Sequence, residues 1–304
     1  MDDLDKRIIL ELDANCRASY QSLALKLGMT ANAIKKRVNR LLETGLIERF
    51  VVGLSLEMNG TDMVIALVRT DGSEFSREFI DQIGHRPEVM QVSPVACGVG
   101  SLYFVFAEAV VPRGLSDLGR FLRGLESVSD VEIHVLLYPR GKKVELTKTH
   151  KKVLRGLLYD PRMTVTEMTK RIGLSARRIR RALQELQDGG GVNLAVWWYL
   201  GAASLTEVII RIEWDDSKVT AHSVVDWLRE EYPLEFWSPF VSATTATVFA
   251  RFVVEDLEKA EMILRNIRKG PFVVSVASLV FYSSHVYPWP GTTALEKLLD
   301  EAGL

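Results

Sequence analysis

The sequence predicts an α+β fold in which a three-helix segment followed by a βαββαβ segment occurs twice. Two observations lead to this prediction. The stretch LGMTANAIKKRVNRLLETGLI, residues 27–47, recurs about 145 positions later as IGLSARRIRRALQELQDGGGV, residues 172–192. After each stretch, the apolar residues change from helical spacing to short β-branched runs that alternate with further helices. The chain is therefore expected to contain two versions of one module.

Three helices are predicted at the start of the first half. Apolar residues at helical spacing predict the first over about residues 4–14. Ser19 and Thr30 are favourable N-caps for a second and a third helix, and Gly28 supplies the positive φ that lets the chain turn sharply between them. This is the helix-turn-helix pattern. The following run, residues 46–57, is β-branched and apolar, and we expect a wing strand that leads into a sheet.

A sheet segment follows in the first half. Strands are predicted over residues 63–69, 89–95, 102–109 and 131–137, and helices over residues 74–83 and 115–125. The order is βαββαβ, which is the ferredoxin-like arrangement. The second half repeats it, with helices over residues 153–158, 164–172, 175–187, 222–232 and 257–267 and strands over residues 192–199, 207–213, 236–242, 247–254 and 273–282.

The boundary between the halves is placed at residues 138–148, which hold a Pro and Gly break and a run of charge. The expected domains are a first winged helix-turn-helix, a first ferredoxin-like domain, a second winged helix-turn-helix, a second ferredoxin-like domain and a tail with a helix over residues 294–302. Their predicted ranges are residues 1–50, 51–140, 141–192, 193–285 and 286–304.

Composition narrows the choice of partners. The formal net charge of −1 is unevenly spread, since residues 142–190 hold thirteen Lys and Arg against five Asp and Glu. Two cysteines, Cys16 and Cys97, have no Cys or His at metal-ligand spacing, so neither a zinc site nor a disulfide framework is predicted. The sequence also has no phosphate-binding loop, and we expect no cofactor. The acidic start lacks an apolar run, and no apolar window of about 18 residues exists for a membrane span. We expect a cytoplasmic protein that does not enter a membrane.

The third helix of each half carries the candidate DNA-binding residues. In the first, Thr30, Asn32, Lys35 and Lys36 are predicted near base edges, and Arg37, Asn39 and Arg40 near phosphates. In the second, the predicted contacts are Ser175, Arg177, Arg178, Arg180, Arg181 and Gln184. The alternatives are a solvated helix face in the first half and, in the second, a degenerate or protein-contacting domain whose wing is weakened by Gly189, Gly190 and Gly191.

The N-terminal residues LDKRIILELDANCRASYQSLALKLGMTANAIKKRVNRLLETGLIERF resemble the DNA-binding domain of Lrp/AsnC, or feast/famine, transcription regulators. The resemblance implies a winged helix-turn-helix that binds double-stranded DNA, followed by a ferredoxin-like effector domain of the RAM type. It also implies dimers that form through the sheets of this second domain. The second half resembles the family more loosely. The whole chain then looks like a tandem of two regulators, able to act as an intramolecular pseudo-dimer or as a homodimer.

The same resemblance places a small-molecule effector near the turn between the second and third sheet strands. That turn keeps Gly98 and Gly100 and adds Ser101, but it lacks the family's acidic residue, and the corresponding turn of the second half, SATTATV, keeps neither glycine. The predicted function is a sequence-specific, non-enzymatic regulator that reads DNA with two winged helices. The alternative is a tetrapyrrole-modifying enzyme of the sirohaem decarboxylase type. Its pocket would need inward-facing Arg and His in the sheet domains, for which His134 and Arg211 are the candidates, whereas the basic third helices favour DNA. A binding module that has lost DNA recognition is a third alternative.

Overall fold

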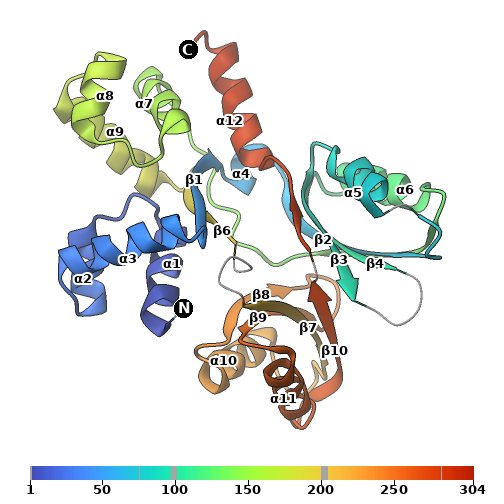
Figure 1. The fold of residues 1–304 in the computed structure, drawn as a ribbon. Coiled ribbons are helices and arrows are strands. Elements are labelled where there is room, and N and C mark those ends of the chain that lie inside the picture. Colours follow the sequence, from blue (N-terminus) through green and yellow to red (C-terminus); the bar gives the residue numbers. More distant parts are fainter. Residues whose placement is uncertain (1, 75, 97–100, 200–204, 282) are drawn as a thin grey trace. The chain divides into compact units, whose positions relative to one another are not determined.

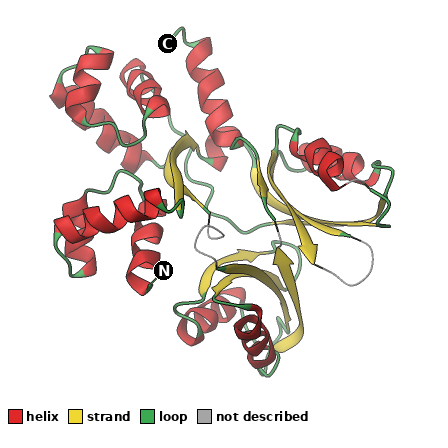
Figure 2. Cartoon of the chain, in the orientation of Figure 1, coloured by secondary structure: helices red, strands yellow, loops and turns green. Residues whose placement is uncertain are grey.

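The chain forms two compact units, each assembled from both halves of the sequence. The computed structural model describes residues 2–74, 76–96, 101–199, 205–281 and 283–304 (Figure 1). Unit 1 comprises Met1–Gly60, Arg140–Ala203 and Trp289–Leu304, and unit 2 comprises Thr61–Pro139 and Ser204–Pro288. Figure 2 shows unit 1 as mostly helical and unit 2 as built around strands. The five consecutive segments expected from the sequence are thus gathered by kind.

Unit 1 holds two three-helix groups, which we call the first and second heads. The first head consists of α1 (Asp3–Ala14), α2 (Tyr20–Leu27) and α3 (Ala31–Glu43), and the second of α7 (Lys148–Tyr159), α8 (Val165–Ile172) and α9 (Ala176–Gly189). All six predicted helices are confirmed. The first helix of the second head begins earlier than expected, because Thr147 and His150 form a capping box at its start.

Two strands join the heads, one contributed by each half. β1 (Ile47–Leu54) and β6 (Val192–Trp198) pair antiparallel, with Phe50 opposite Val196 and Val51 opposite Ala195. Since Ala195 occupies the position in β6 that Phe50 occupies in β1, this register places an approximate two-fold axis at the middle of the ladder. Each predicted wing strand therefore finds its partner in the other half rather than in the adjacent sheet.

The C-terminal segment covers one side of this ladder. α12 (Pro290–Glu301) packs against β1, near the short helix α4 (Leu56–Asn59) that the sequence did not predict. The hydroxyl of Thr292 donates to the carbonyl of Val52 at 2.8 Å. A Cβ on Gly53 would lie 2.7 Å from the backbone of Gly291, so only glycine permits this approach.

Unit 2 contains two ferredoxin-like segments, as predicted. The first runs β2 (Asp62–Thr70), α5 (Ser76–Gly84), β3 (Val89–Ala96), β4 (Leu102–Ala109), α6 (Arg113–Arg123) and β5 (Val128–Val135). The second runs β7 (Thr206–Trp214), α10 (Ala221–Glu231), β8 (Phe236–Val241), β9 (Thr247–Val254), α11 (Leu257–Ile267) and β10 (Val273–Phe281). Their strand orders, β5-β2-β4-β3 and β10-β7-β9-β8, are equivalent.

The two sheets of unit 2 meet edge to edge at both ends. β3 pairs with β10 through Val95 and Phe281, and the backbone N–H of Leu137, just after β5, donates to Val241 of β8 at 2.8 Å. A two-residue strand, β11 (His285–Val286), adds to β3. Helices cover the outer faces (Figure 1), while aromatic pairs such as Phe106 with Phe240 lie between the sheets at a centroid distance of 5.3 Å.

Candidate nucleic-acid interface

The turn before α3 is fixed by local chemistry. α2 ends at Gly28, which adopts φ +68°, and a Cβ there would meet nothing within 4 Å, so the backbone conformation alone favours glycine. The hydroxyl of Thr30 then accepts a hydrogen bond from the N–H of Ala33 at 3.2 Å and caps α3. Buried Ile34 and Val38 hold α3 against its own head. This arrangement sets which face of α3 meets solvent.

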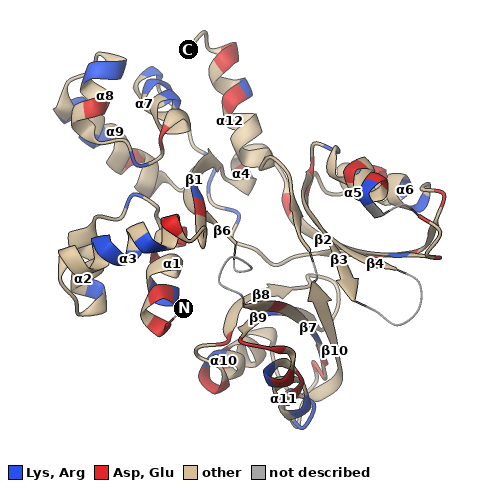
Figure 3. Cartoon of the chain, viewed as in Figure 1, with Lys and Arg blue, Asp and Glu red and all other residues tan. Residues whose placement is uncertain are grey.

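The solvent face of α3 carries amide and ammonium groups. Asn32, Lys35, Lys36 and Asn39 are exposed, and within the described part of the chain none has a polar side-chain partner. Figure 3 shows the basic residues along this helix. Asn can pair with adenine in the major groove, and Lys can neutralise phosphate or bind guanine. These four predicted residues therefore lie together and keep their donors available.

Arg37 and Arg40 lie differently. Asp5 of α1 is 1% exposed, and its two carboxylate oxygens accept from Arg37 at 2.8 Å and from Arg40 at 2.5 Å. Arg37 also donates to Asp2, the N-cap of α1, at 2.7 Å. Hydrogen bonds to Asp2 and Asp5 raise the pKa of Arg37. Both arginines were predicted near phosphates, and in the free chain they brace α3 against α1.

The second head repeats the turn. α8 ends at Gly173 with φ +66°, and Ser175 accepts from the N–H of Arg178 at 3.4 Å to cap α9. Arg177 and Arg180 are exposed and, among the described residues, unpartnered. Their charges add to those along α7 and α8 (Figure 3). The start of α9 is thus a concentrated cationic surface.

The remaining predicted residues of α9 are engaged within the chain. Arg181 pairs with Glu185 at 2.7 Å, and Arg178 donates to the hydroxyl of Thr149 at 3.2 Å. The amide of Gln184 donates to both carboxylate oxygens of Asp188, at 2.9 and 2.8 Å. Surface contacts of this kind contribute little to stability because solvent screens them, so a phosphate can compete for these donors.

The glycines after α9 serve packing. Gly190 has φ +67° and accepts from the N–H of Lys142 at 2.8 Å, while a Cβ on Gly191 would lie 2.2 Å from Val144. The carbonyl of Gly191 accepts from Ser55 at 3.0 Å. Gly190 and Gly191 therefore make room for residues 142–144, which lead into the second head.

The effector turn is only partly described. Gly98 and Gly100 lie outside the described residues. Ser101 is half-buried, and its carbonyl accepts from the N–H of Thr70 at 2.9 Å, which anchors the start of β4. In the second half, the hydroxyls of Thr245 and Ser242 lie 3.0 Å apart and close their own turn.

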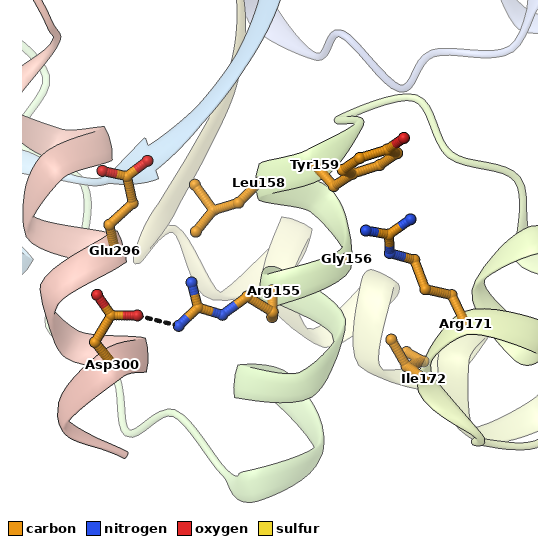
Figure 4. A pocket seen from close by; sticks show the side chains of 8 residues that line it. All are labelled: Arg155, Gly156, Leu158, Tyr159, Arg171, Ile172, Glu296 and Asp300. Carbon is orange, nitrogen blue, oxygen red and sulfur yellow. Dashed lines mark hydrogen bonds and ion pairs between the residues drawn. The ribbon is translucent and has the colours of Figure 1, made fainter. Parts of the chain in front are cut away.

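A surface depression of about 460 Å³ lies where α7, α8 and α12 meet (Figure 4). Its lining residues are Arg155, Gly156, Leu158, Tyr159, Arg171, Ile172, Glu296 and Asp300. Arg155 donates to Asp300 and to the carbonyl oxygen of Leu304, and the Arg171 guanidinium lies 3.6 Å from the centre of the Tyr159 ring. The positive groups are thus balanced by carboxylates or stacked, and the depression marks how α12 attaches to the second head.

Between the sheets of unit 2, a polar network joins the two halves. Arg211 of β7 binds both oxygens of Glu132 of β5, at 2.7 and 2.8 Å, and one oxygen of Glu213 at 2.7 Å. His134 is 3% exposed, and its two ring nitrogens lie 2.9 Å from Glu132 and 3.1 Å from Ser242. Although burial opposes it, the Arg211 charge holds the pKa of Glu132 below its usual value. The structure therefore brings His134 and Arg211 together and leaves both satisfied.

Two further properties of the described residues concern metal binding and membrane insertion. Their His, Cys, Asp and Glu side chains form no group of three or more able to hold a metal ion. Among their helices, none is both long and apolar enough to cross a membrane.

Comparisons with known proteins identify helix-turn-helix segments in the same two places. A family model described as winged helix-turn-helix DNA-binding matches residues 1–48 and again residues 146–190. An uncharacterized HTH-type transcriptional regulator of Pyrococcus abyssi is 30% identical over 141 residues, which are 45% of this chain and 92% of that protein. AldR, an HTH-type transcriptional regulator of Mycolicibacterium smegmatis, is 32% identical over 43% of this chain and 76% of its own length.

Two further similar proteins differ in how much of their length this chain covers. An uncharacterized HTH-type regulator of Pyrococcus horikoshii is 31% identical over 99 residues, and this chain covers 66% of its length, just under two thirds. The crystal structure of the siroheme decarboxylase NirDL matches all of this chain and all of its own, with a TM-score of 0.57 and 15% identity. That likeness is one of fold.

Proposed function

This chain belongs to the Lrp/AsnC family of helix-turn-helix transcriptional regulators, and we therefore propose that it binds duplex DNA sequence-specifically through α3 and α9 together. One observation carries the proposal. Two helices with equivalent caps present donors to solvent that have no partner among the described residues: Asn32, Lys35 and Lys36 on one and Arg177 and Arg180 on the other. The β1 and β6 ladder joins the two heads within unit 1.

The two helices offer different chemistry, so the proposed DNA site has two unlike halves. Asn32 on α3 is suited to adenine, whereas Arg177 and Arg180 on α9 can bind guanine bidentately or hold phosphates. α9 supplies more of the salt-dependent affinity, because each phosphate neutralised by a cation releases counterions. An approximate two-fold relation between the heads favours half-sites separated by about one helical turn of DNA, or roughly 10 base pairs, or a multiple of it.

Selection of bound fragments from random duplex DNA tests the proposal. The full chain should enrich a two-part site, and Lys35→Ala with Lys36→Ala should remove one part while leaving the other. Substitution of Arg177→Ala with Arg180→Ala should reduce the slope of log K against log salt by about 2, which corresponds to two lost phosphate contacts. Recovery of no enriched sequence would count against sequence-specific binding by the two helices. An unchanged slope in the Arg177→Ala, Arg180→Ala variant would count against contact between α9 and DNA.

The control removes the same charge elsewhere. Arg268 and Lys269 follow α11 in unit 2, are exposed and, in the described part of the chain, have no side-chain partner. Arg268→Ala with Lys269→Ala should leave both the selected site and the salt slope unchanged. A slope that falls equally in this variant would mean that net charge, and not α9, determines the salt dependence.

The chain is proposed to act as an intramolecular pseudo-dimer. The support is that β1 with β6, and β3 with β10, pair strands of the two halves inside one chain. Sedimentation in solution should then give a monomer, and that monomer should protect both half-sites on DNA.

We also propose that a small-molecule effector binds near Ser101. Thermal shift measurements with free amino acids test this proposal.

A tetrapyrrole-modifying activity is the second candidate, because the whole-chain likeness to a siroheme decarboxylase coincides with the meeting of His134 and Arg211. The contacts weigh against it: His134 is buried with both nitrogens hydrogen-bonded, and Arg211 binds Glu132 and Glu213. An absorption spectrum after addition of an iron porphyrin tests it. A shifted Soret band that His134→Ala abolishes would favour the enzyme.

A further inference from the structure

Two arginines connect the heads beside the β1 and β6 ladder. Arg17, after α1, donates to the carbonyl oxygens of Pro161 and Met163 at 2.6 and 3.0 Å. Arg162, after α7, donates to the carbonyl oxygens of Cys16 and of Ala18, the latter at 3.3 Å. Each arginine therefore binds the two residues that flank the other arginine.

The exchange follows the two-fold relation of the heads. Arg17 and Arg162 are about 145 positions apart, the offset that relates the two halves. Each has its backbone N–H held at 2.9 Å by the side chain two residues earlier, Asn15 in one head and Asp160 in the other. Such Asx turns fix the local backbone. We call Arg17 and Arg162 the reciprocal arginine pair.

The surroundings make the pair well ordered. Both side chains are half-buried, and burial lowers the pKa of Arg17 from its ordinary value. The Arg162 guanidinium lies 5.1 Å from the ring centres of both Tyr20 and Phe50. A guanidinium offers donors in a fixed fork, so it can bridge two carbonyls where an ammonium places a single point charge. The pair thereby supplies donors to four carbonyls in the turns between helices.

The ladder alone does not fix the angle between the heads. Adjacent strands twist relative to one another over a wide range, roughly 10–35°, and two-stranded ribbons twist by more. The arginine contacts join the turns of the two heads in addition to the ladder, and they oppose this rotation. The carbonyls lie in the α1 to α2 and α7 to α8 turns, next to the helices on which α3 and α9 pack. Loss of the pair should therefore free the twist while the ladder still joins the heads.

We infer that the reciprocal arginine pair positions the two recognition helices and so sets the spacing of half-sites that the protein accepts. This rests on the proposed function, since spacing has meaning only if both heads bind DNA. One base pair of added spacing rotates a half-site by about 34–36° around the duplex, because a turn holds 10–10.5 base pairs. A rigid pair of heads rejects that change, and a twisting pair accepts it.

The first measurement needs no DNA. Nitroxide labels at Gln21→Cys and Thr166→Cys, equivalent exposed sites on α2 and α8, report the distance between heads in full-length protein with Cys16→Ala and Cys97→Ala. Pulsed dipolar spectroscopy should give one narrow distribution, and Arg17→Ala with Arg162→Ala should broaden it. The single variant Arg17→Ala keeps half of the contacts and should show intermediate broadening. An unchanged width in the double variant overturns the inference.

The second measurement uses duplexes that carry both selected half-sites at spacings changed by one and two base pairs. Unlabelled protein should lose at least about tenfold in affinity off its preferred spacing, as expected when one of two linked sites disengages. The double variant should bind all spacings within about threefold and keep its affinity for one isolated half-site. Retained spacing preference overturns the assignment even if the distance distribution broadens.

The matched control is Arg7→Ala with Lys152→Ala, again equivalent positions, whose side chains have no partner within the described residues. It removes the same charge from α1 and α7 and should keep a narrow distribution and the spacing preference. Absence of any DNA binding by the unsubstituted protein would refute the proposed function, while the DNA-free distances still decide whether the arginines restrain the heads.

Discussion

Asp5 binds some of the basic side chains of α3 and leaves others exposed to solvent. Its buried carboxylate accepts hydrogen bonds from Arg37 and Arg40, whereas Asn32, Lys35, Lys36 and Asn39 of α3 have no polar partner within the described part of the chain. Removing either arginine would take a hydrogen-bond donor from this buried carboxylate. Composition alone treats all these cations as equivalent.

At the scale of single residues, Gly84 offers a sharp stability test. It ends α5, and a Cβ there would lie 1.7 Å from the ring of Tyr287, whose hydroxyl donates to the carbonyl of Ile80 at 3.2 Å. Gly84→Ala should displace this ring and lower the free energy of unfolding of unit 2 by about 1–3 kcal/mol, the usual cost of overpacking. Urea denaturation checks the value.

Gly114 provides the comparison. It lies in α6, where the nearest atom to an added Cβ is 3.4 Å away, so Gly114→Ala should be neutral or stabilising. The double variant Gly84→Ala with Tyr287→Leu should recover part of the loss, because the smaller side chain vacates the space. A Gly84→Ala protein as stable as the parent would show that Tyr287 moves aside without cost.

At the scale of elements, local signals predict local structure well. Thr30, Ser175 and the positive-φ glycines Gly28 and Gly173 act within a few residues, and the helices they bound were predicted from the sequence. The partner of β1 was not predicted, because a register between strands about 145 residues apart leaves no local signature. The spacing of apolar and β-branched residues indicates that a strand forms, but it does not indicate which strand it pairs with.

The same limit applies to the candidate site. Exposed Lys35, Lys36, Arg177 and Arg180 were predicted from helical spacing, which fixes the solvent face. The reciprocal arginine pair was missed, because Arg17 and Arg162 bind backbone carbonyls, which every residue carries. Only their equivalent positions in the two halves distinguished them in the sequence.

The contact between Glu132 of β5 and Arg211 of β7 should make the stability of unit 2 depend on pH. Arg211 keeps the pKa of Glu132 below its ordinary 4.5, so the folded state binds this proton less readily than the unfolded state. The resulting stability is present above about pH 4.5 and is lost as the pH falls through the lowered value. The free energy of unfolding should therefore decline on acidification below pH 4.5, and less so in Glu132→Gln.

Urea midpoints between about pH 3 and pH 7 measure this effect, and the comparison is of slopes, since Glu132→Gln also weakens Arg211 at neutral pH. Glu43→Gln, on the exposed side of α3 in unit 1, should leave the transition of unit 2 unchanged. A Glu132→Gln protein with the full acid decline would assign the effect to other carboxylates.

At the scale of the whole molecule, α12 is expected to stabilise unit 1 alone. Leu295 and Leu299 are fully buried in that unit. Leu295→Ala should lower the free energy of unfolding of unit 1 by about 2–5 kcal/mol, the range for a buried leucine. Hydrogen exchange followed by mass spectrometry separates the units, and amides of β1 and β6 should lose protection while those of β2 and β4 keep it.

Lys297→Ala, on the exposed side of the same helix, should leave exchange in both units unchanged. Equal loss of protection in β2 and β4 after Leu295→Ala would mean that the two units unfold as one. A difference confined to unit 1 would show that each unit has its own cooperative transition.

The interleaving of the units has a consequence for synthesis. β1 is translated early, but its partner β6 emerges only after residue 198, and the residues of α12 that pack on β1 come last. During this interval β1 presents an unpaired edge to other nascent chains, a recognised route to misassembly. A ribosome-bound fragment ending before β6 should therefore depend on chaperones, and exchange of β6 between two chains on one polysome would give a domain-swapped dimer with the same ladder.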